Sequence, residues 1–268
     1  MDQKLEKPPY MDGYLKTNLG IMKDAIKEDW DMVIVVDGIE GSGKSVLAQQ
    51  VAKEADPSFN IDRIVFNPKK FVKAIEKAGK YEAIVYDEAY GGLNTRQVLS
   101  QTNRALVSMM AEIRQKNLFV IIVLPCFFEL DKYVAVWRSR ALIHVYTDGF
   151  KRGLFRFYNQ ARKKNMYING KKTYDYRKGI HNFHGRFLNQ YTVDEAEYRA
   201  KKLKALHEHG RQTVNDIAKQ LVYYLMENHR YTGKMVENAM TPLGFSLSER
   251  RYQELHKEIK DILRDSVT

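Results

Sequence analysis

A glycine-rich loop carries the clearest chemistry in this sequence. Residues 38–45 read GIEGSGKS, fit the pattern G-x-x-x-x-G-K-[ST], follow the apolar run MVIVVD and precede a helical pattern. In this strand–loop–helix context, such a loop holds phosphate groups with its backbone N–H groups at a helix N-terminus. The residues expected to bind a nucleotide are Gly38, Gly41, Ser42, Gly43, Lys44 and Ser45. We expect Lys44 to bridge the β- and γ-phosphates and Ser45 to bind Mg²⁺.

Two adjacent acids form a second candidate element. The apolar run AIVY ends in Asp87 and Glu88, at strand spacing from the glycine-rich loop. We expect Asp87 to hold Mg²⁺ through water, and Glu88 to be the catalytic base that polarises the water attacking the γ-phosphate. Such a glutamate favours an ATP hydrolase over a small-molecule kinase, in which the substrate hydroxyl is the nucleophile. ATP and Mg²⁺ are the expected cofactors.

Two arginines are candidate catalytic residues of a different kind. Arg138 and Arg140 directly precede the apolar run Ala141–Tyr146. Multimeric ATPases commonly complete a neighbour's site with an arginine, which stabilises charge on the phosphoryl group being transferred. The alternative for each is an ordinary surface or ion-pair arginine.

The positive charge of the chain is concentrated in one window. The 268 residues carry a formal net charge of +11, and the segment Lys151–Gln190 holds eleven basic residues and one acid, interleaved with aromatic residues. Cations that neutralise phosphates, together with rings that stack, are typical of a nucleic-acid surface. The candidate DNA-binding residues are Lys151, Arg152, Arg162, Lys163, Lys164, Lys171, Lys172, Arg177 and Lys178. The alternative is a solvated β-hairpin with charged outer faces.

The elements that must position these groups follow from hydrophobic patterning. Strands are predicted at 32–37, 63–66, 83–86, 118–124 and 141–146, and helices between them at 45–53, 70–78, 97–116 and 131–137. The strands are nearly all apolar, which indicates a parallel α/β sheet covered by helices on both faces. Past Thr147 the period changes to two, with LFRFY and MYING separated by a basic turn. This pattern predicts a β-hairpin that extends the sheet.

The last third of the chain is predicted to be helical. Thr192–Glu195 reads as a capping box that opens a charged helix ending at Gly210. Three further amphipathic helices predict a small module over 211–268, either a helix-turn-helix DNA reader or a docking unit. The predicted organisation is an ATPase core with its hairpin extension (1–190), a connecting helix (191–210) and this module.

Composition excludes several classes of protein. A single cysteine, Cys126, excludes a disulfide framework and any multi-cysteine metal site. The longest apolar run, 118–124, is too short to span a bilayer, and the N-terminus lacks the apolar core of a secretory signal. We therefore expect a cytoplasmic location, which would be the host cytoplasm for a viral protein.

Residues 30–160 resemble the P-loop ATPases that have an additional strand and a catalytic glutamate, especially the FtsK–HerA and Zot-like DNA-pumping motors. The resemblance is carried by GIEGSGKS, by IVYDEAY and by the order of five strands. It implies a RecA-like core, ATP hydrolysis, assembly into a ring, and work on DNA or on a secretion partner. By position, Lys44 and Ser45 would bind the nucleotide, and Asp87 and Glu88 would serve Mg²⁺ and catalysis. The run LFVIIVL leads into Leu124-Pro125-Cys126, where these motors often place a polar sensor.

The favoured hypothesis is a Mg²⁺-dependent ATPase motor that forms a homo-oligomeric ring and moves double-stranded DNA, as in viral genome packaging or conjugative transfer. Residues 211–268 would dock to a protein of the viral or transfer complex. One alternative is an ATP-switched DNA-binding or helicase-loader protein with slow hydrolysis. A second is a nucleotide or small-molecule kinase with a basic lid over 151–190.

Overall fold

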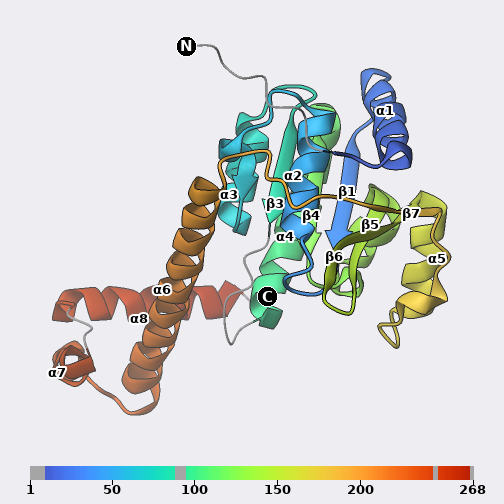
Figure 1. Ribbon diagram of the computed structural model, residues 1–268. Coiled ribbons are helices and arrows are strands. Elements are labelled where there is room, and N and C mark those ends of the chain that lie inside the picture. The colour runs from blue at the N-terminus through green and yellow to red at the C-terminus, as the bar shows by residue number, and fades with distance from the viewer. Residues whose placement is uncertain (1–9, 88–94, 244–246, 266–268) are drawn as a thin grey trace, which may run out of the picture. The chain divides into compact units, whose positions relative to one another are not determined.

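A sheet of strand order β2-β3-β4-β1-β5-β6-β7 organises the first of the two units into which the chain divides, Met1–Ala205 and Leu206–Thr268 (Figure 1). The computed structural model describes residues 10–87, 95–243 and 247–265. The strands are β1 (Met32–Asp37), β2 (Ile64–Val65), β3 (Ala83–Asp87), β4 (Phe119–Leu124), β5 (Ser139–Asp148), β6 (Lys151–Asn159) and β7 (Phe183–Arg186). The first five are parallel, and β6 and β7 are antiparallel additions at one edge.

Helices cover both faces of this sheet, as the apolar strands predict. The helices are α1 (Gly13–Lys27), α2 (Lys44–Ala55), α3 (Pro68–Lys77), α4 (Thr95–Gln115), α5 (Gln160–Gly170), α6 (Glu195–Asn228), α7 (Gly233–Met240) and α8 (Glu249–Asp265). Short 3-10 turns lie at Ile61–Arg63, Phe127–Glu129, Tyr176–Lys178 and Thr241–Leu243, and a π-helical turn at Tyr133–Arg138. Apolar side chains of α3, α4 and α5 share one buried cluster with alternate residues of the strands, while α2 packs on β3 and β4 and α1 packs on α2. The P-loop type of α/β sheet is therefore confirmed.

The sheet order places one strand between the two strands that carry the expected chemistry. β4 pairs with β1 on one side and with β3 on the other, all in parallel. The additional strand implied by the resemblance is thus β4. The glycine-rich loop follows β1 and Asp87 ends β3, so both lie at the carboxyl edge of the sheet, where open α/β sheets bind ligands.

The predicted hairpin is partly wrong. β5 and β6 do form an antiparallel hairpin, but the segment MYING lies in the helix α5 and the second added strand is β7. Asn159 caps this helix by accepting a hydrogen bond from the Arg162 amide at 3.1 Å. The buried residues of α5 are Lys163, Met166, Tyr167 and Gly170. Counted from Lys163, the other three follow at three, four and seven residues, which is the spacing of one helix face. The apolar run is short, so periodicity alone did not distinguish a helix from a strand.

Two helices also differ from expectation: one was not predicted, and the other extends past its predicted end. Helix α1, which the patterning did not reveal, buries Leu15, Leu19 and Ile26. Helix α6 runs through Gly210, where a helix end was predicted. A helical glycine costs only about 1 kcal/mol relative to alanine, so a long helix can carry one. The second unit contains the end of α6 with α7 and α8, around a core that includes Val222, Val236, Met240 and Tyr252. None of the described helices is long and apolar enough to cross a membrane.

Candidate functional site

The glycine-rich loop has the conformation of a phosphate-binding loop. Gly38 and Gly43 have φ values of +139° and +101°, which disfavour any residue with a side chain. A Cβ on Gly38 would lie 2.0 Å from the Val145 carbonyl oxygen, so the strand β5 allows only glycine here. Gly43 precedes α2 without a side-chain cap, which leaves the first N–H groups of the helix available to an anion.

Two side chains of the loop fit a bound phosphate. The Lys44 ammonium donates hydrogen bonds to the carbonyl oxygens of Gly38 and Ile39, at 2.6 and 2.8 Å. Burial lowers the pKa of Lys44 from its usual value. The Ser42 hydroxyl is buried and has no hydrogen-bond partner among the described residues. A buried donor without an acceptor is costly, and a phosphate oxygen would satisfy it.

Oxygen ligands for a cation meet beside the loop. The Asp87 side chain at the end of β3 is 3% exposed, and Ser45 lies in the first turn of α2. A single ammonium group, that of Lys202, lies 3.4 Å from both Asp87 carboxylate oxygens and 3.5 Å from Ser45 Oγ. The two oxygen-bearing side chains therefore surround one cation position. A carboxylate and a hydroxyl are hard ligands that suit Mg²⁺ together with phosphate oxygens. Glu88 lies outside the described residues.

The segment that follows β7 lies over this site. The Phe187 ring lies against Gly43, where an added Cβ would be 3.1 Å from ring carbons. The Gln50 amide of α2 donates to the carbonyl oxygens of Leu188 and Gln190, each at 2.8 Å. Thr192 was expected to cap α6, but its hydroxyl donates to the Gln49 carbonyl oxygen at 3.2 Å. These contacts tie the entry to α6 onto the phosphate loop helix.

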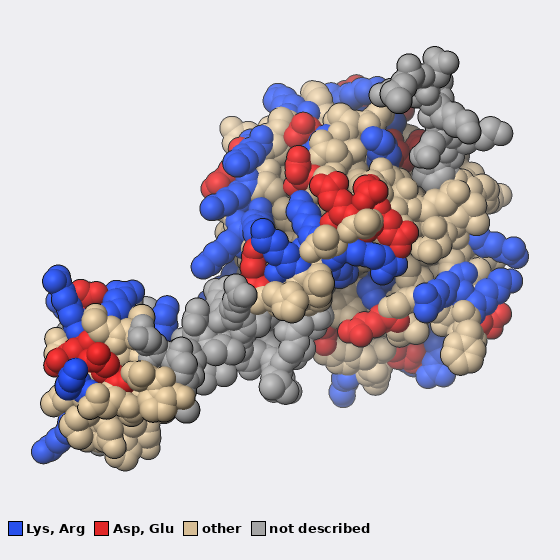
Figure 2. All heavy atoms as spheres, turned by 60° about the vertical axis from the view of Figure 1, so that its left-hand side comes forward, with Lys and Arg blue, Asp and Glu red and all other residues tan. Residues whose placement is uncertain are grey.

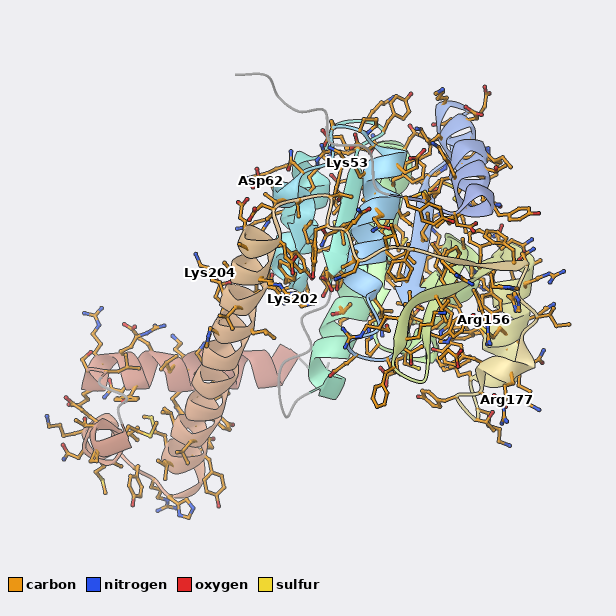
Figure 3. All side chains as sticks on the ribbon, viewed as in Figure 1. Lys53, Asp62, Arg156, Arg177, Lys202 and Lys204 are labelled. Atoms are coloured by element: carbon orange, nitrogen blue, oxygen red, sulfur yellow. The ribbon has the colours of Figure 1, made fainter. Side chains whose placement is uncertain are left out.

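Helix α6 then contributes Tyr198 and Lys202 to the site. Asp194 caps the helix by accepting a hydrogen bond from the Glu197 amide at 2.7 Å. One turn later, the Tyr198 hydroxyl donates to Asp87 Oδ2 at 2.5 Å. Burial and the Asp87 charge raise the pKa of Tyr198, so it remains a neutral donor. Figure 3 shows Lys202 on the side of α6 that faces the core and Lys204 on the other side.

A second polar cluster supports the start of the loop. Asp37, fully buried, accepts hydrogen bonds from the Phe127 amide at 2.9 Å and from the Tyr176 hydroxyl, and lies 2.9 Å from His144 Nδ1. The rings of His144 and Tyr176 are stacked with centroids 4.1 Å apart. Burial and the Asp37 charge raise the pKa of Tyr176. This cluster anchors the segment after α5 at the carboxyl edge of the sheet.

The predicted catalytic arginines lie at the opposite edge of the sheet. Arg138 donates to the fully buried Asp31 carboxylate at 2.6 Å and to the Met110 carbonyl oxygen at 3.2 Å. Arg140 lies over the Trp30 ring at 4.6 Å and donates to Gln160 at 3.4 Å. Both precede or begin β5, whereas the phosphate loop follows the carboxyl end of the neighbouring strand β1. In this chain Arg138 and Arg140 therefore pack at the edge opposite the glycine-rich loop, and a role in a neighbouring subunit's site stays a prediction.

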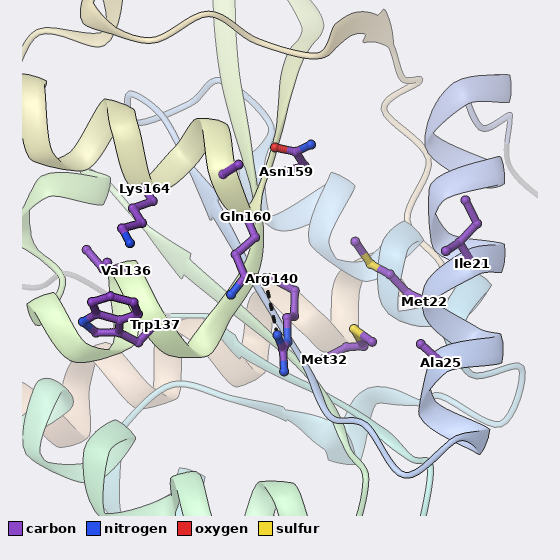
Figure 4. A pocket seen from close by; sticks show the side chains of 11 residues that line it. Ile21, Met22, Ala25, Met32, Val136, Trp137, Arg140, Asn159, Gln160 and Lys164 are labelled. Carbon is purple, nitrogen blue, oxygen red and sulfur yellow. Dashed lines mark hydrogen bonds between the residues drawn. The ribbon is translucent and has the colours of Figure 1, made fainter.

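Arg140 also lines a hollow at that edge, with a volume of about 580 Å³ (Figure 4). Apolar side chains of α1, β1 and the π-helical turn line it, together with Arg140 and polar groups at the start of α5. Lys164, a predicted DNA contact, lies here with its ammonium 4.1 Å from the centre of the Trp137 ring. It therefore belongs to a different surface from the phosphate loop.

Lys163 was predicted to contact DNA, and this prediction is wrong. Its side chain is fully buried, and its ammonium donates to the carbonyl oxygens of Ala135 and Val136 at 2.6 and 3.2 Å. Carbonyls of the π-helical turn thus take the place of a phosphate partner. Burial, with smaller effects of the Arg140 and Lys164 charges, lowers the pKa of Lys163 to about 7.

We expect the free energy of unfolding to rise with pH because of Lys163. Between about pH 7 and 10 the unfolded chain binds a proton at this lysine that the folded chain has released, so stability falls as the pH falls from about 10 to about 7 and levels off below 7. The gain from pH 7 to 9 should be about 2 kcal/mol. Urea unfolding of wild type and Lys163→Met, followed by the fluorescence of Trp30 and Trp137, checks this. If the free energy of unfolding depended on pH equally in both proteins, a lowered pKa of Lys163 would be contradicted.

The remaining basic residues of the window divide between two places. Arg162 begins α5 and donates to the carbonyl oxygens of Ile180 and His181. Exposed cations near the carboxyl edge are Lys151, Arg152, Lys171, Lys172, Arg177 and Lys178. The Arg152 guanidinium lies beside the glycine-rich loop, 3.8 Å from the position that a Cβ on Gly41 would take. Most of the interleaved rings, including Phe155, Phe157 and Tyr158, are buried in the core. The rings therefore pack the sheet, and the cations remain as the candidate DNA surface.

In the view of Figure 2, basic and acidic side chains are interspersed over the visible face.

The sequence predicted the glycine-rich loop and Asp87 as site residues, but it did not predict Tyr198 and Lys202. Their spacing of four places both on one face of a helix, which the sequence does show. Nothing in the pattern indicates that this face meets the end of β3, more than a hundred residues earlier.

Comparison with known proteins finds similarity among solved structures. No protein-family model matches the chain, and no curated protein matches it. Among solved structures, the chain is similar to the N-terminal domain of zonular occludens toxin from Neisseria meningitidis, with 14% sequence identity and a TM-score of 0.36. The match covers 63% of this chain and 98% of that domain.

Proposed function

We propose that this chain is a Mg²⁺-dependent P-loop ATPase that couples ATP hydrolysis to the movement of double-stranded DNA. The observation that carries the nucleotide part is the convergence of the phosphate loop, Ser45 and Asp87 at the carboxyl edge of the sheet. Lys44 and the loop amides would hold the phosphates, while Ser45 and Asp87 would hold Mg²⁺, which supplies charge neutralisation at the transferring phosphoryl group. Glu88 would polarise the attacking water.

The DNA part is supported by charge at the same edge. The exposed cations of residues 151–152 and 171–178 lie at the end of the core where nucleotide would bind, and Arg177 lies at this end in Figure 3. Phe150, at the tip of the β5–β6 hairpin beside Lys151, is fully exposed. An exposed ring next to cations suits contact with a nucleic acid. We further propose a homo-oligomeric ring, because a motor must hold its DNA while one subunit exchanges nucleotide. The second unit would dock to a partner of the packaging or transfer complex.

We expect ATP hydrolysis by the purified chain to rise when duplex DNA is added. The stimulation should fall steeply with salt, because binding a polyanion releases counterions. Replacing Lys171, Lys172, Arg177 and Lys178 with glutamine should flatten the log–log salt slope by about 3.6, or about 0.9 per lost phosphate contact, and leave DNA-independent hydrolysis unchanged. A matched control is the quadruple glutamine variant at Lys69, Lys70, Lys73 and Lys77 of α3. If the rate of ATP hydrolysis were the same with and without duplex DNA, the proposal of a DNA-moving motor would be contradicted.

The Glu88→Gln variant separates the three candidate functions. In a hydrolase it should bind ATP and stall, because a glutamine cannot accept the proton of the attacking water. Wild-type turnover near one per minute on bound DNA would instead indicate an ATP-switched loader. Phosphate transfer to a nucleoside, with little release to water and with Glu88→Gln still active, would indicate a kinase. Radiolabelled ATP with product separation distinguishes these outcomes.

A further inference from the structure

The Lys202 ammonium lies among the side chains that were expected to bind Mg²⁺. Its ammonium lies among Asp87 Oδ1, Asp87 Oδ2, Ser45 Oγ and the Tyr198 hydroxyl, at 3.3 to 3.5 Å from each. Asp87 and Ser45 are the two side chains proposed to hold Mg²⁺. One monovalent cation of the chain itself therefore lies within contact distance of both proposed metal ligands.

We propose that Lys202 and Mg²⁺ compete for this position, so that Lys202 controls how readily the Mg²⁺–nucleotide complex binds and binding of that complex displaces Lys202 from Asp87. This inference rests on the proposed function, because it needs a nucleotide that brings Mg²⁺ to Ser45 and Asp87. It makes Lys202 a residue that sets the cation dependence of the site.

Charge balance explains why the two cations exclude each other. Asp87 is almost fully buried, and a buried carboxylate needs a compensating positive charge. Lys202 supplies that charge in this structure, and the Lys44 ammonium is close enough for each lysine to affect the site electrostatically. A divalent ion at the same oxygens would add two further charges within a few ångströms. Repulsion between close like charges is strong in a partly buried site, so Lys202 must move when Mg²⁺ enters.

The packing of α6 allows Lys202 to move while its helix stays attached. The Lys202 side chain is 32% exposed and hangs on a flexible four-carbon stem. Tyr198, one turn earlier, is 3% exposed and packs against the rings of Phe66 and Tyr191. Lys201 donates separately to the Ile61 carbonyl oxygen at 2.7 Å. These two residues hold the first turns of α6, and Lys202 is the member of the group that can leave.

The first test is the Mg²⁺ dependence of nucleotide binding. A fluorescent ATP analogue is titrated onto wild type, Lys202→Ala, Lys202→Arg and Lys204→Ala, with Mg²⁺ or with EDTA. Lys202→Ala should lower the Mg²⁺ concentration for half-maximal binding by about 5-fold, as expected for loss of one partly exposed ion pair. The gain should be absent in EDTA. Lys202→Arg should behave like wild type, and Lys204→Ala, on the other side of the same helix, should change nothing.

The second test follows the Lys202 amine directly. Acylation of lysines by an amine-reactive ester, read by mass spectrometry, should increase at Lys202 when Mg²⁺–ATP binds and stay constant with ATP in EDTA. Lys204 is the internal reference. Reduced acylation, together with weaker Mg²⁺–ATP binding by Lys202→Ala, would show that Lys202 is a phosphate ligand and would overturn the competition. Unchanged binding in Lys202→Ala would overturn it as well. Failure of wild type to bind Mg²⁺–ATP at all would overturn the proposed function, and this inference with it.

Discussion

Replacing Lys44 with alanine should lower steady-state ATP hydrolysis by at least about 100-fold, the effect typical of losing one charged group that stabilises the transition state. The lysine ammonium now bonds to the carbonyl oxygens of Gly38 and Ile39, at the mouth of the loop. A nucleotide would offer phosphate oxygens in their place, and the lysine would stabilise charge that grows on the transferring phosphoryl group. Nucleotide affinity should fall as well, measured by titration calorimetry with Mg²⁺–ATP.

Lys53→Ala is the control for this experiment. Lys53 lies near the end of the same helix α2 and donates to the carbonyl oxygens of Pro57 and Phe59, away from the loop (Figure 3). Its replacement should leave hydrolysis unchanged. If Lys44→Ala kept wild-type turnover while Lys53→Ala lost it, the phosphate loop would not be the catalytic site.

Replacing Arg138 with methionine should lower the free energy of unfolding by about 3 kcal/mol, because it leaves a buried carboxylate without its cation. Asp31 is fully buried, the Arg138 side chain is 16% exposed, and their hydrogen bond is 2.6 Å long. Trp30 and Trp137 are the two tryptophans of the chain, and both lie beside this pair in sequence. Urea unfolding followed by tryptophan fluorescence therefore reports on the unit Met1–Ala205, which contains the Arg138–Asp31 pair.

A neighbouring ion pair provides the control for Arg138. Arg114 pairs with Asp29 at 3.0 Å, but these side chains are 42% and 79% exposed. An exposed pair contributes about 1 kcal/mol or less, so Arg114→Met should change stability little. Below its unfolding temperature, Arg138→Met should hydrolyse ATP at the wild-type rate per folded molecule. Normal stability with lost hydrolysis would instead support the prediction that Arg138 is a catalytic residue.

Local patterns predicted the parts of this protein that depend on neighbouring residues. The strand Met32–Asp37 and the loop-to-helix transition that follows it were predicted correctly, because apolar runs and glycines constrain the backbone over short distances. Errors arose where two local signals competed. MYING was read as a strand because its apolar run is short, although Lys163, Met166 and Tyr167 have helical spacing. Gly210 was read as a helix end, although one glycine is a small cost in a helix as long as α6.

By itself, the sequence determined the α/β class, the glycine-rich loop after β1 and the acid that ends β3, because each is encoded within a few consecutive residues. Only the tertiary structure decided the use of individual charges. Lys163, Lys164 and Lys202 are chemically equivalent in the sequence, yet one is buried on carbonyl oxygens, one lies over a tryptophan and one lies at the proposed metal ligands. The partner of a long cationic side chain depends on which distant element packs beside it, and residues 198–202 meet Asp87, more than a hundred residues away in sequence, only in the folded chain.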